Sequence, residues 1–366
     1  MTSTPCDPAK FENPLQVGGI RTGTLDFPNP NGGQACRVAH VNTGAGLRLT
    51  VALDRGGDIV EASYNQHGLA YLTPNDYKPP SHAYHRDAEW LAAWPGGLVT
   101  TTGPILMGVP RTENGVTTSL HGHFSNTPAA VLEVANPDPQ RSSWDMRLVL
   151  LIRDTRMFGP SLEVRREIRC RLGEPEFAIV DEVTNRGDER SPHAMLYHVN
   201  FGYPLLDEGT RLVYQGRGQL RDARGDLASP TTAEQCKRAP APCGSYRAAR
   251  EQLLIVEPTA DAAGNVHAGI LNESLGLGLR LKYPASALPR LASWLHYGPR
   301  GSYVASLEPF CGSILGQSAD DHPSAATMLA PGETKRYEVA YRICATADEL
   351  DSLAAQDGPL KLEAVL

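Results

Sequence analysis

Short runs in which hydrophobic and polar residues alternate recur along the chain, and this pattern predicts β-strands rather than helices. Segments of helical periodicity are scarce; the best candidate is 347–356, and the pattern at 250–256 is ambiguous. The alternation therefore predicts an all-β, largely antiparallel fold. The clearest alternating runs lie at 47–54, 147–154, 161–172, 177–185, 276–284 and 336–343.

Turn-forming residues are spread over the whole chain. Its 366 residues include 35 glycines and 29 prolines, which fits many strands joined by loops better than alternating strands and helices. The stretch around 222–249 is polar and rich in proline and alanine, but strand-like sequence resumes on both sides of it. We therefore expect one two-sheet sandwich domain over residues 1–366, interrupted by a long loop at 222–249.

The net charge of the chain argues against nucleic acids and acidic membranes as binding partners. The formal net charge is −7, so there is no basic surface to attract nucleic acid or an acidic membrane. No apolar run approaches the roughly 20 residues that span a bilayer, and the first residues lack a basic start followed by an apolar segment. We expect a cytoplasmic protein whose partner is a small molecule; oligomeric state is not predicted.

The seven cysteines do not change this interpretation. They form no CxxC pair and are odd in number, which argues against a disulfide framework or a structural zinc site. Cys236 and Cys243 share the Pro/Ala-rich stretch and could pair if oxidised.

Three predicted strands each carry ionisable residues on one face of an otherwise apolar or small-residue run. Because side chains alternate in a strand, His121 and His123 would share one face, as would His198 and Asn200. Buried imidazoles and a buried carboxylate such as Glu308 are costly unless they are paired or used. Their convergence would form an acid/base site. The three segments are SLHGHF at 119–124, YHVNFGYPLL at 197–206 and YVASLEP at 303–309.

Glu308 and His198 are the leading candidates for proton transfer. In an enclosed cleft, burial would raise the pKa of Glu308 and make it a usable base near neutral pH. Pro309 suggests that the strand ends there, and the alternative is a strand-end carboxylate held by arginine or backbone donors. His198 could deliver a proton from the inner face of a strand, and the alternative is a core histidine with satisfied hydrogen bonds.

The remaining candidates each have a functional and a structural interpretation. His121 and His123 with a carboxylate such as Glu308 could bind a divalent metal, or one histidine could stabilise charge on a substrate oxygen. Trp294 could stack on a sugar or pack in the core, and Asn200 could orient the His198 ring or contact a substrate hydroxyl. Further hydroxyl contacts, or simply ion pairs and surface residues, are Arg55, Asp58 and Arg111.

Several of these segments, taken in order, resemble one family. The resemblance runs from about residue 45 to 343 and points to DUF4432, an aldose 1-epimerase-like family of the galactose mutarotase-like superfamily. It is most specific at the LHG, YHVNFGYPLLD and LEP segments. The chain departs from ordinary mutarotases at the HGH sequence around His121. The matching segments are LDRGGDI, WPGGLVTTTG, LHGHFSNTPA, YHVNFGYPLLD and SLEPFCG.

The resemblance implies a β-supersandwich with a sugar cleft on its concave face. It also implies that Glu308 removes the proton of the anomeric hydroxyl, that His198 protonates the ring oxygen, and that His121 positions the sugar. This chemistry needs no nucleotide, redox cofactor or metal.

The expected function is therefore a carbohydrate isomerase of the aldose 1-epimerase type that interconverts sugar anomers. Two alternatives are kept: a metal-assisted sugar isomerase, epimerase or lyase that uses His121, His123 and Glu308 as ligands, and a sugar-binding protein without catalysis. The sequence does not identify the sugar or the anomer that is preferred.

Overall fold

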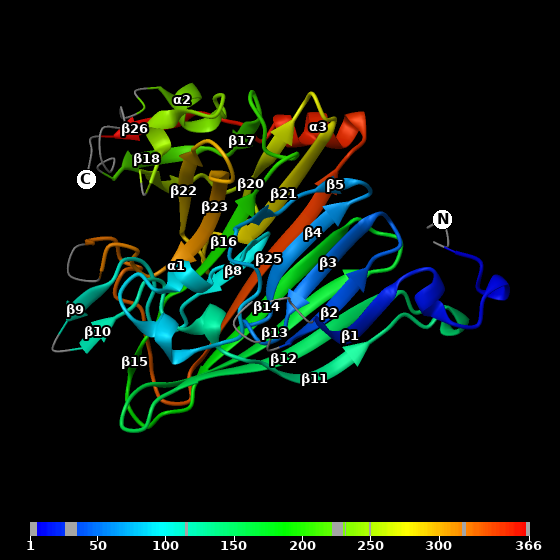
Figure 1. Cartoon of the computed structure of the whole chain (residues 1–366), viewed down its shortest axis with the longest axis horizontal. Helices are drawn as coiled ribbons and strands as arrows, with labels where there is room; N and C mark the ends of the chain where they lie inside the picture. Colours follow the sequence, from blue (N-terminus) through cyan, green and yellow to red (C-terminus); the bar gives the residue numbers. More distant parts are fainter. Residues whose placement is uncertain are drawn as a thin grey trace.

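Two large β-sheets make up most of the computed structural model, which describes residues 6–25, 35–113, 116–221, 230, 232–248, 250–316 and 320–363, without the side chains of 111–118. Figure 1 shows the sheets packed over each other, with the short helices at the periphery. Within the described residues, 12 strands form the larger sheet and eight the smaller one. Among the described residues, the paired strands run antiparallel except β18 and β26, which are parallel.

The larger sheet has the order β1 (Gly19–Leu25), β2 (Cys36–Asn42), β3 (Leu47–Ala52), β4 (Asp58–Tyr64), β8 (Val99–Thr102), β16 (Met195–Phe201), β23 (Tyr303–Cys311), β22 (Arg290–Tyr297), β19 (Gln252–Pro258), β18 (Gly216–Leu220) and β26 (Leu360–Glu363), with β5 (His67–Gly68) beside β4. The smaller sheet has the order β11 (Ala130–Ala135), β12 (Asp145–Thr155), β13 (Ser161–Arg171), β14 (Glu176–Asn185), β25 (Thr334–Cys344), β21 (Leu277–Pro284), β20 (Asn265–Asn272) and β17 (Arg211–Val213).

The other elements are short. The two-stranded pairs are β6 (Tyr71–Leu72) with β7 (Gly96–Gly97), β9 (Arg111–Glu113) with β10 (Val116–Thr118), and β15 (Ser191–Pro192) with β24 (Met328–Leu329). The α-helices are α1 (Trp90–Ala93), α2 (Ala233–Lys237) and α3 (Ala347–Ala354), and the 3₁₀ helices are η1 (Pro8–Lys10), η2 (Pro14–Gln16), η3 (His82–His85), η4 (Phe124–Asn126), η5 (Pro139–Arg141) and η6 (Gly244–Tyr246).

The main hydrophobic core lies between the two sheets, and alternation along β16 shows how it positions the site. Tyr197 and Val199 are fully buried in this core. Because successive side chains point to opposite faces, His198 and Asn200 project from the outer face of the larger sheet. Burying each large apolar side chain contributes about 1.5–3 kcal/mol, so the core fixes which residues of β16 face outward.

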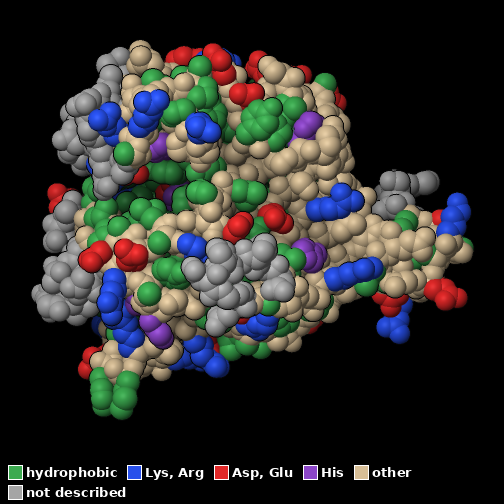
Figure 2. Space-filling view, in the orientation of Figure 1, with side chains coloured by type: hydrophobic (Ala, Val, Ile, Leu, Met, Phe, Trp, Pro, Cys, Tyr) green, Lys and Arg blue, Asp and Glu red, His purple; other side chains and the backbone are tan. Residues whose placement is uncertain are grey.

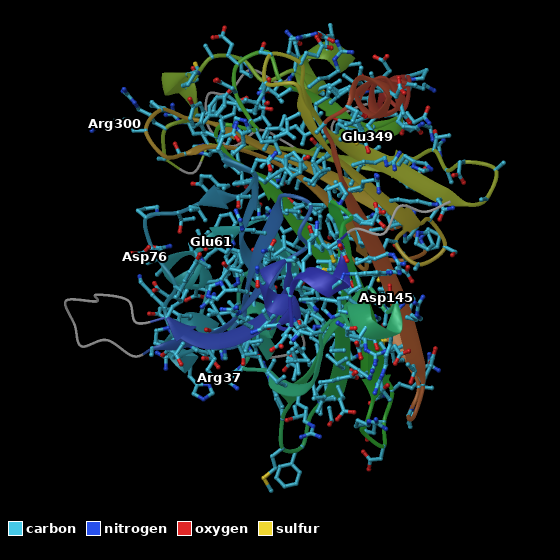
Figure 3. All side chains as sticks on the ribbon, turned by 90° about the vertical axis from the view of Figure 1, so that its right-hand side faces the viewer. Arg37, Glu61, Asp76, Asp145, Arg300 and Glu349 are labelled. Atoms are coloured by element: carbon cyan, nitrogen blue, oxygen red, sulfur yellow. The ribbon has the colours of Figure 1, made fainter. Side chains whose placement is uncertain are left out.

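A buried polar network ties the two sheets together beneath the outer face. The Arg166 guanidinium on β13 donates to both carboxylate oxygens of Asp181, at 2.8 and 2.7 Å, and to the Thr101 hydroxyl at 2.8 Å. The Tyr197 hydroxyl on β16 donates to Asp181 at 2.7 Å. The side chains of Arg37 and Asp145, by contrast, lie at the periphery of the molecule (Figure 3).

The predicted elements compare closely with those observed. The six alternating runs coincide with β3, β12, β13, β14, β21 and β25, and the predicted helix coincides with α3. The ambiguous segment at 250–256 enters strand β19. The all-β, largely antiparallel prediction is therefore confirmed.

Two local predictions were wrong. Residues 119–124 form a turn and the start of η4 rather than a strand, and β23 continues through Pro309 to Cys311. The stretch 222–249, expected to be a long loop, lies between β18 and β19 and includes the short helices α2 and η6; its residues 222–229, 231 and 249 lie outside the described residues. All seven cysteines are free, so Cys236 and Cys243 are not bonded to each other. In the described part of the chain, no helix combines the length and apolar character of a membrane span.

Candidate active site

The centre of the candidate site is a histidine–glutamate pair on two neighbouring strands. Strands β16 and β23 are antiparallel, and the register that pairs Val199 with Leu307 sets His198 directly across from Glu308. The His198 Nε2 atom lies 3.1 Å from the Glu308 Oε1 atom. The two residues are only 5% and 3% exposed. The two leading sequence candidates therefore meet in the structure, on the outer face of the larger sheet.

Neighbouring polar residues on the same two strands support this pair. The Ser306 hydroxyl donates a hydrogen bond of 2.5 Å to Glu308 Oε1. The Asn200 amide donates to the backbone carbonyls of His198 and Gly97, at 3.0 and 3.1 Å. Its Oδ1 atom is buried with no hydrogen-bond partner in the structure. Asn200 thus holds the backbone beside His198 and keeps an acceptor free for a ligand.

His121 joins the pair from a turn rather than from a strand. Its ring centroid lies 5.9 Å from that of His198, nearly perpendicular, and 4.7 Å from that of Trp90. The backbone of His121 has a φ of 59°, an unusual left-handed conformation for this residue type that is often found at functional sites. Gly122 also has a positive φ, and a Cβ there would lie 2.6 Å from the Leu106 carbonyl oxygen.

Three tryptophans enclose the imidazoles. The rings of Trp94 and Trp294 lie 5.7 and 5.5 Å from the His198 ring, and Trp90 stacks on Trp94 at 5.2 Å. The Trp94 indole N–H donates to the Thr100 hydroxyl at 2.9 Å, which fixes the ring over β8. Trp294 was predicted as a stacking residue, whereas Trp90 and Trp94 were missed. The start of the WPGG segment at Trp94 was the only signal for them.

Burial opposes charge on all three ionisable groups. It raises the pKa of Glu308 to about 8, and the negative charge of Glu251 adds to this, while Ser306 and Arg221 act in the opposite direction. Burial lowers the pKa of His198 to about 3, helped by the neighbouring His121. Near neutral pH the His198–Glu308 pair therefore holds one proton, which resides mainly on Glu308 while His198 is neutral.

A charged group borders the site on the side of β19. The Glu251 carboxylate accepts the Trp294 indole N–H at 2.7 Å and a hydrogen bond from the Arg221 guanidinium at 2.5 Å. The side chains of Glu251 and Arg221 are 21% and 15% exposed. Neither residue was singled out in the sequence, because nothing near them in the chain indicates that they approach Trp294.

Figure 2 shows the outer surface of this region. A hollow opens between the strands β18 and β22 on one side and the α1 region on the other, with hydrophobic and histidine side chains in its wall. Buried ring nitrogens without partners, His121 Nδ1 and His198 Nδ1, belong to the same group of residues. Buried polar atoms are rarely left unpaired in folded proteins, so these atoms indicate a place for a polar ligand.

His123 does not join His121, contrary to the prediction that they share a strand face. Its ring stacks on His85 at 4.0 Å, and the Arg156 guanidinium approaches it at 3.3 Å. The metal-ligand set of His121, His123 and Glu308 is thus not assembled. Among the residues that the structure describes, no three or more His, Cys, Asp and Glu side chains are grouped so that they could hold a metal ion.

Arg55 and Asp58 have structural partners. Arg55 is 1% exposed and donates to the Lys78 carbonyl at 3.2 Å. Asp58 accepts the Thr101 backbone N–H at 2.9 Å and lies 3.7 Å from Arg166. Asp58 therefore belongs to the buried network below the site, as the ion-pair alternative expects, whereas the Nε and Nη2 atoms of Arg55 are buried without a hydrogen-bond partner among the described residues. The side chain of Arg111 lies outside the described residues.

Comparison with known proteins identifies the family of this chain and solved structures with a similar fold. A family profile described as "Domain of unknown function (DUF4432)" matches residues 33–343. A protein from Klebsiella pneumoniae, named a "putative aldose 1-epimerase", has a similar structure, with a TM-score of 0.79 and 20% identity over 94% of this chain and 90% of that chain. No curated protein matches the sequence.

Two further solved structures are similar over most of their length. A galactose mutarotase-like protein from Clostridium acetobutylicum has a TM-score of 0.59 and 13% identity, over 90% of this chain and 99% of that chain. A protein from Escherichia coli K12, also named a "putative aldose 1-epimerase", has a TM-score of 0.55 and 16% identity, over 89% of this chain and 99% of that chain. These similarities confirm the predicted galactose mutarotase-like β-supersandwich and, at such identities, show the fold alone.

Proposed function

The chain belongs to the DUF4432 family, and from this premise we propose that it is a carbohydrate isomerase of the aldose 1-epimerase type. The observation that carries the proposal is the buried His198–Glu308 pair, in which His198 Nε2 and Glu308 Oε1 lie 3.1 Å apart. Anomer exchange requires one proton to leave the anomeric hydroxyl while another reaches the ring oxygen. A cytoplasmic location stays a prediction.

The His198–Glu308 pair carries one proton in total, which is the number that this reaction requires. The reaction begins when this proton moves from Glu308 to His198, after which the Glu308 carboxylate takes the proton of the anomeric hydroxyl while His198 gives its proton to the ring oxygen. The bond between the anomeric carbon and the ring oxygen breaks, which leaves an open-chain aldehyde, a protonated Glu308 and a neutral His198. Rotation about the C1–C2 bond and the reverse transfers close the ring on the other face of the carbonyl. The pair returns to its starting state, and no atom or electron is gained or lost.

The surrounding residues would hold the sugar during these transfers. Burial lowers the pKa of His121 to about 4, so its ring is neutral near pH 7 and can bond to a substrate hydroxyl. The ring faces of Trp94 and Trp294 are suited to contact sugar C–H groups. The free Asn200 acceptor and the unpaired ring nitrogen of His198 add further polar contacts. A polyhydroxylated ring would satisfy both kinds of surface.

The direct test is NMR exchange spectroscopy of the anomeric signals of a panel of aldoses, with the protein measured before and after chelation. We expect faster exchange for at least one aldose, unchanged by the chelator. Activity lost on chelation would favour the metal-assisted alternative. Saccharide binding without faster exchange would favour the sugar-binding alternative.

The two neighbouring histidines provide a matched pair of variants for the same assay. His121→Ala removes a ring beside His198 and should reduce kcat/KM by about 10-fold or more, because a positioned polar group contributes on this scale. His123→Ala removes a ring that stacks on His85, outside the site, and should change kcat/KM less than about threefold. Equal losses in both variants, with both proteins folded, would contradict the assigned roles.

A further inference from the structure

A row of side chains crosses the larger sheet and ends at the acid/base pair. Arg221 follows β18, Glu251 precedes β19, and Trp294 lies on β22, so three adjacent strands supply the row. Arg221 bonds to one carboxylate oxygen of Glu251, and the indole N–H of Trp294 bonds to the other. The Trp294 ring then meets the His198 ring at 5.5 Å. Each carboxylate oxygen of Glu251 therefore accepts one hydrogen bond, and these two bonds fix the orientation of the Trp294 indole.

From this row we infer that Glu251, paired with Arg221, is a positioning residue that holds Trp294 against His198 and places a negative charge at the edge of the site that contains Glu308. The inference deepens the proposed function and rests on it for its catalytic meaning. It assigns no contact between Glu251 and the substrate. The residue acts through Trp294 and through its charge.

The negative charge of Glu251 affects the protonation of the His198–Glu308 pair. Glu251 raises the pKa of Glu308, whereas Arg221 lowers it. Glu251 also raises the pKa of His121, against the effect of burial. A carboxylate that was held only to anchor a tryptophan would not need this location. The charged and titratable groups described around the Glu308 carboxyl are His198 on β16, His121 in its turn, Glu251 before β19 and Arg221 after β18.

Infrared titration of the full-length protein tests the charge directly and needs no substrate. The band of the protonated Glu308 carboxyl is isolated by subtracting the spectra of Glu308→Gln, which removes the contributions of other buried carboxyls. In the wild type we expect the band to disappear around pH 8. Glu251→Gln should shift the midpoint down by about 0.5 pH unit, and Arg221→Gln should shift it up by about as much.

The exposed Arg217–Glu257 pair on the same two strands provides the control. Its side chains are 60% and 47% exposed, and neither is among the groups that act on Glu308. Glu257→Gln removes the same charge as Glu251→Gln and should leave the midpoint unchanged. A midpoint that is equal in Glu251→Gln and Glu257→Gln, or that moves in the same direction in Glu251→Gln and Arg221→Gln, would overturn the inference. If Glu251→Gln does not fold, the Arg221→Gln variant tests the inference by itself: an upward shift of the infrared midpoint supports it, and an unchanged midpoint overturns it.

The role of Glu251 in positioning Trp294 is tested separately, by NMR of the Trp294 indole N–H. Glu251→Gln keeps an oxygen acceptor for the Trp294 N–H, whereas Glu251→Ala removes it. The NMR signal of this indole N–H, assigned with Trp294→Phe, should stay near its wild-type position in Glu251→Gln and move in Glu251→Ala. An unmoved signal in Glu251→Ala would overturn this part of the inference.

The outcomes for the inference and for the proposed function are separate. If no aldose exchanges faster but the midpoints shift as expected, the charge arrangement stands and the proposed function fails. If exchange is fast but the midpoints do not respond to Glu251, the proposed function stands and this inference fails. Where both hold, the alkaline limb of kcat/KM should shift in the same directions as the infrared midpoints.

Discussion

At the scale of single residues, the chemistry depends on a carboxyl group that is costly to bury. Glu308 would ionise at a pKa near 4.5 in the unfolded chain, but burial raises its pKa to about 8 in the folded protein. The folded state therefore holds its proton where the unfolded state has lost it, and stability falls as the pH rises between these values. The same property makes Glu308 able to exchange a proton near neutral pH.

This cost predicts a pH-dependent gain in stability for Glu308→Gln. Glutamine has similar volume and no charge to lose, and His198 is present in both proteins, so its contribution largely cancels. The free energy of unfolding of the variant relative to wild type should rise from pH 5 to pH 9 by on the order of a few kcal/mol. Urea unfolding at several pH values measures it. A difference that stays constant over this range would contradict the raised pKa.

At the scale of elements, strands were predictable and the turn around His121 was not. The alternation along β16 correctly put His198 and Asn200 on one face, because periodicity of two is a local property. The same rule failed at 119–124, since Gly122 and the positive φ of His121 turn the chain there. His121 was thus placed in the site through the family resemblance, and its partner His123 was misplaced.

The contacts between elements explain what else the sequence did not reveal. Trp90 and Trp94 lie far from His198 in the chain, and Glu251 is 43 residues from the Trp294 indole that it holds. Such pairs depend on the order of strands in the sheet, which no local pattern specifies. Conversely, Asp58 looked available in sequence and is occupied in the buried network.

The turn that carries His121 makes a prediction at this scale. In Gly122→Ala, the new Cβ would meet the Leu106 carbonyl oxygen at 2.6 Å in a left-handed conformation. Gly276→Ala is the control, since Gly276 also has a positive φ but has no atom within 4 Å of its Cβ position. Both variants should lose about 1–2 kcal/mol of stability from backbone strain, measured by urea unfolding.

Only Gly122→Ala should also lose more stability from the clash, and it alone should reduce anomer exchange, because it displaces His121. Wild-type exchange in a folded Gly122→Ala protein would show that the position of His121 does not matter. Loss of exchange in Gly276→Ala would show that strain remote from the site is sufficient.

At the scale of the whole molecule, the site depends on two sheets held in register by the Arg166–Asp181 network. Asp181→Asn would remove the carboxylate that accepts two hydrogen bonds from the fully buried Arg166 guanidinium and leave the more distant Asp58, at 3.7 Å, as its nearest negative charge. Breaking a buried pair in this way costs about 3–5 kcal/mol. The matched control is Asp145→Asn, which breaks an exposed pair with Arg171 at 2.6 Å and should cost at most about 1 kcal/mol. Equal losses in urea unfolding would contradict the central role of the network.

The architecture as a whole was foreseeable, and the family profile and structural similarities confirm it. What the whole fold adds is the meeting of His198 and Glu308, which come from segments more than a hundred residues apart. The central claim is that this pair exchanges one proton with a sugar.

The most direct measurement of that claim is anomer exchange by NMR in wild type and in Glu308→Gln, with an aldose that the wild type accelerates. Glutamine keeps the approximate volume of Glu308 and cannot accept the proton. The account predicts that kcat/KM falls by at least about 100-fold in the variant, while the protein stays folded. Near-wild-type exchange in folded Glu308→Gln would contradict it.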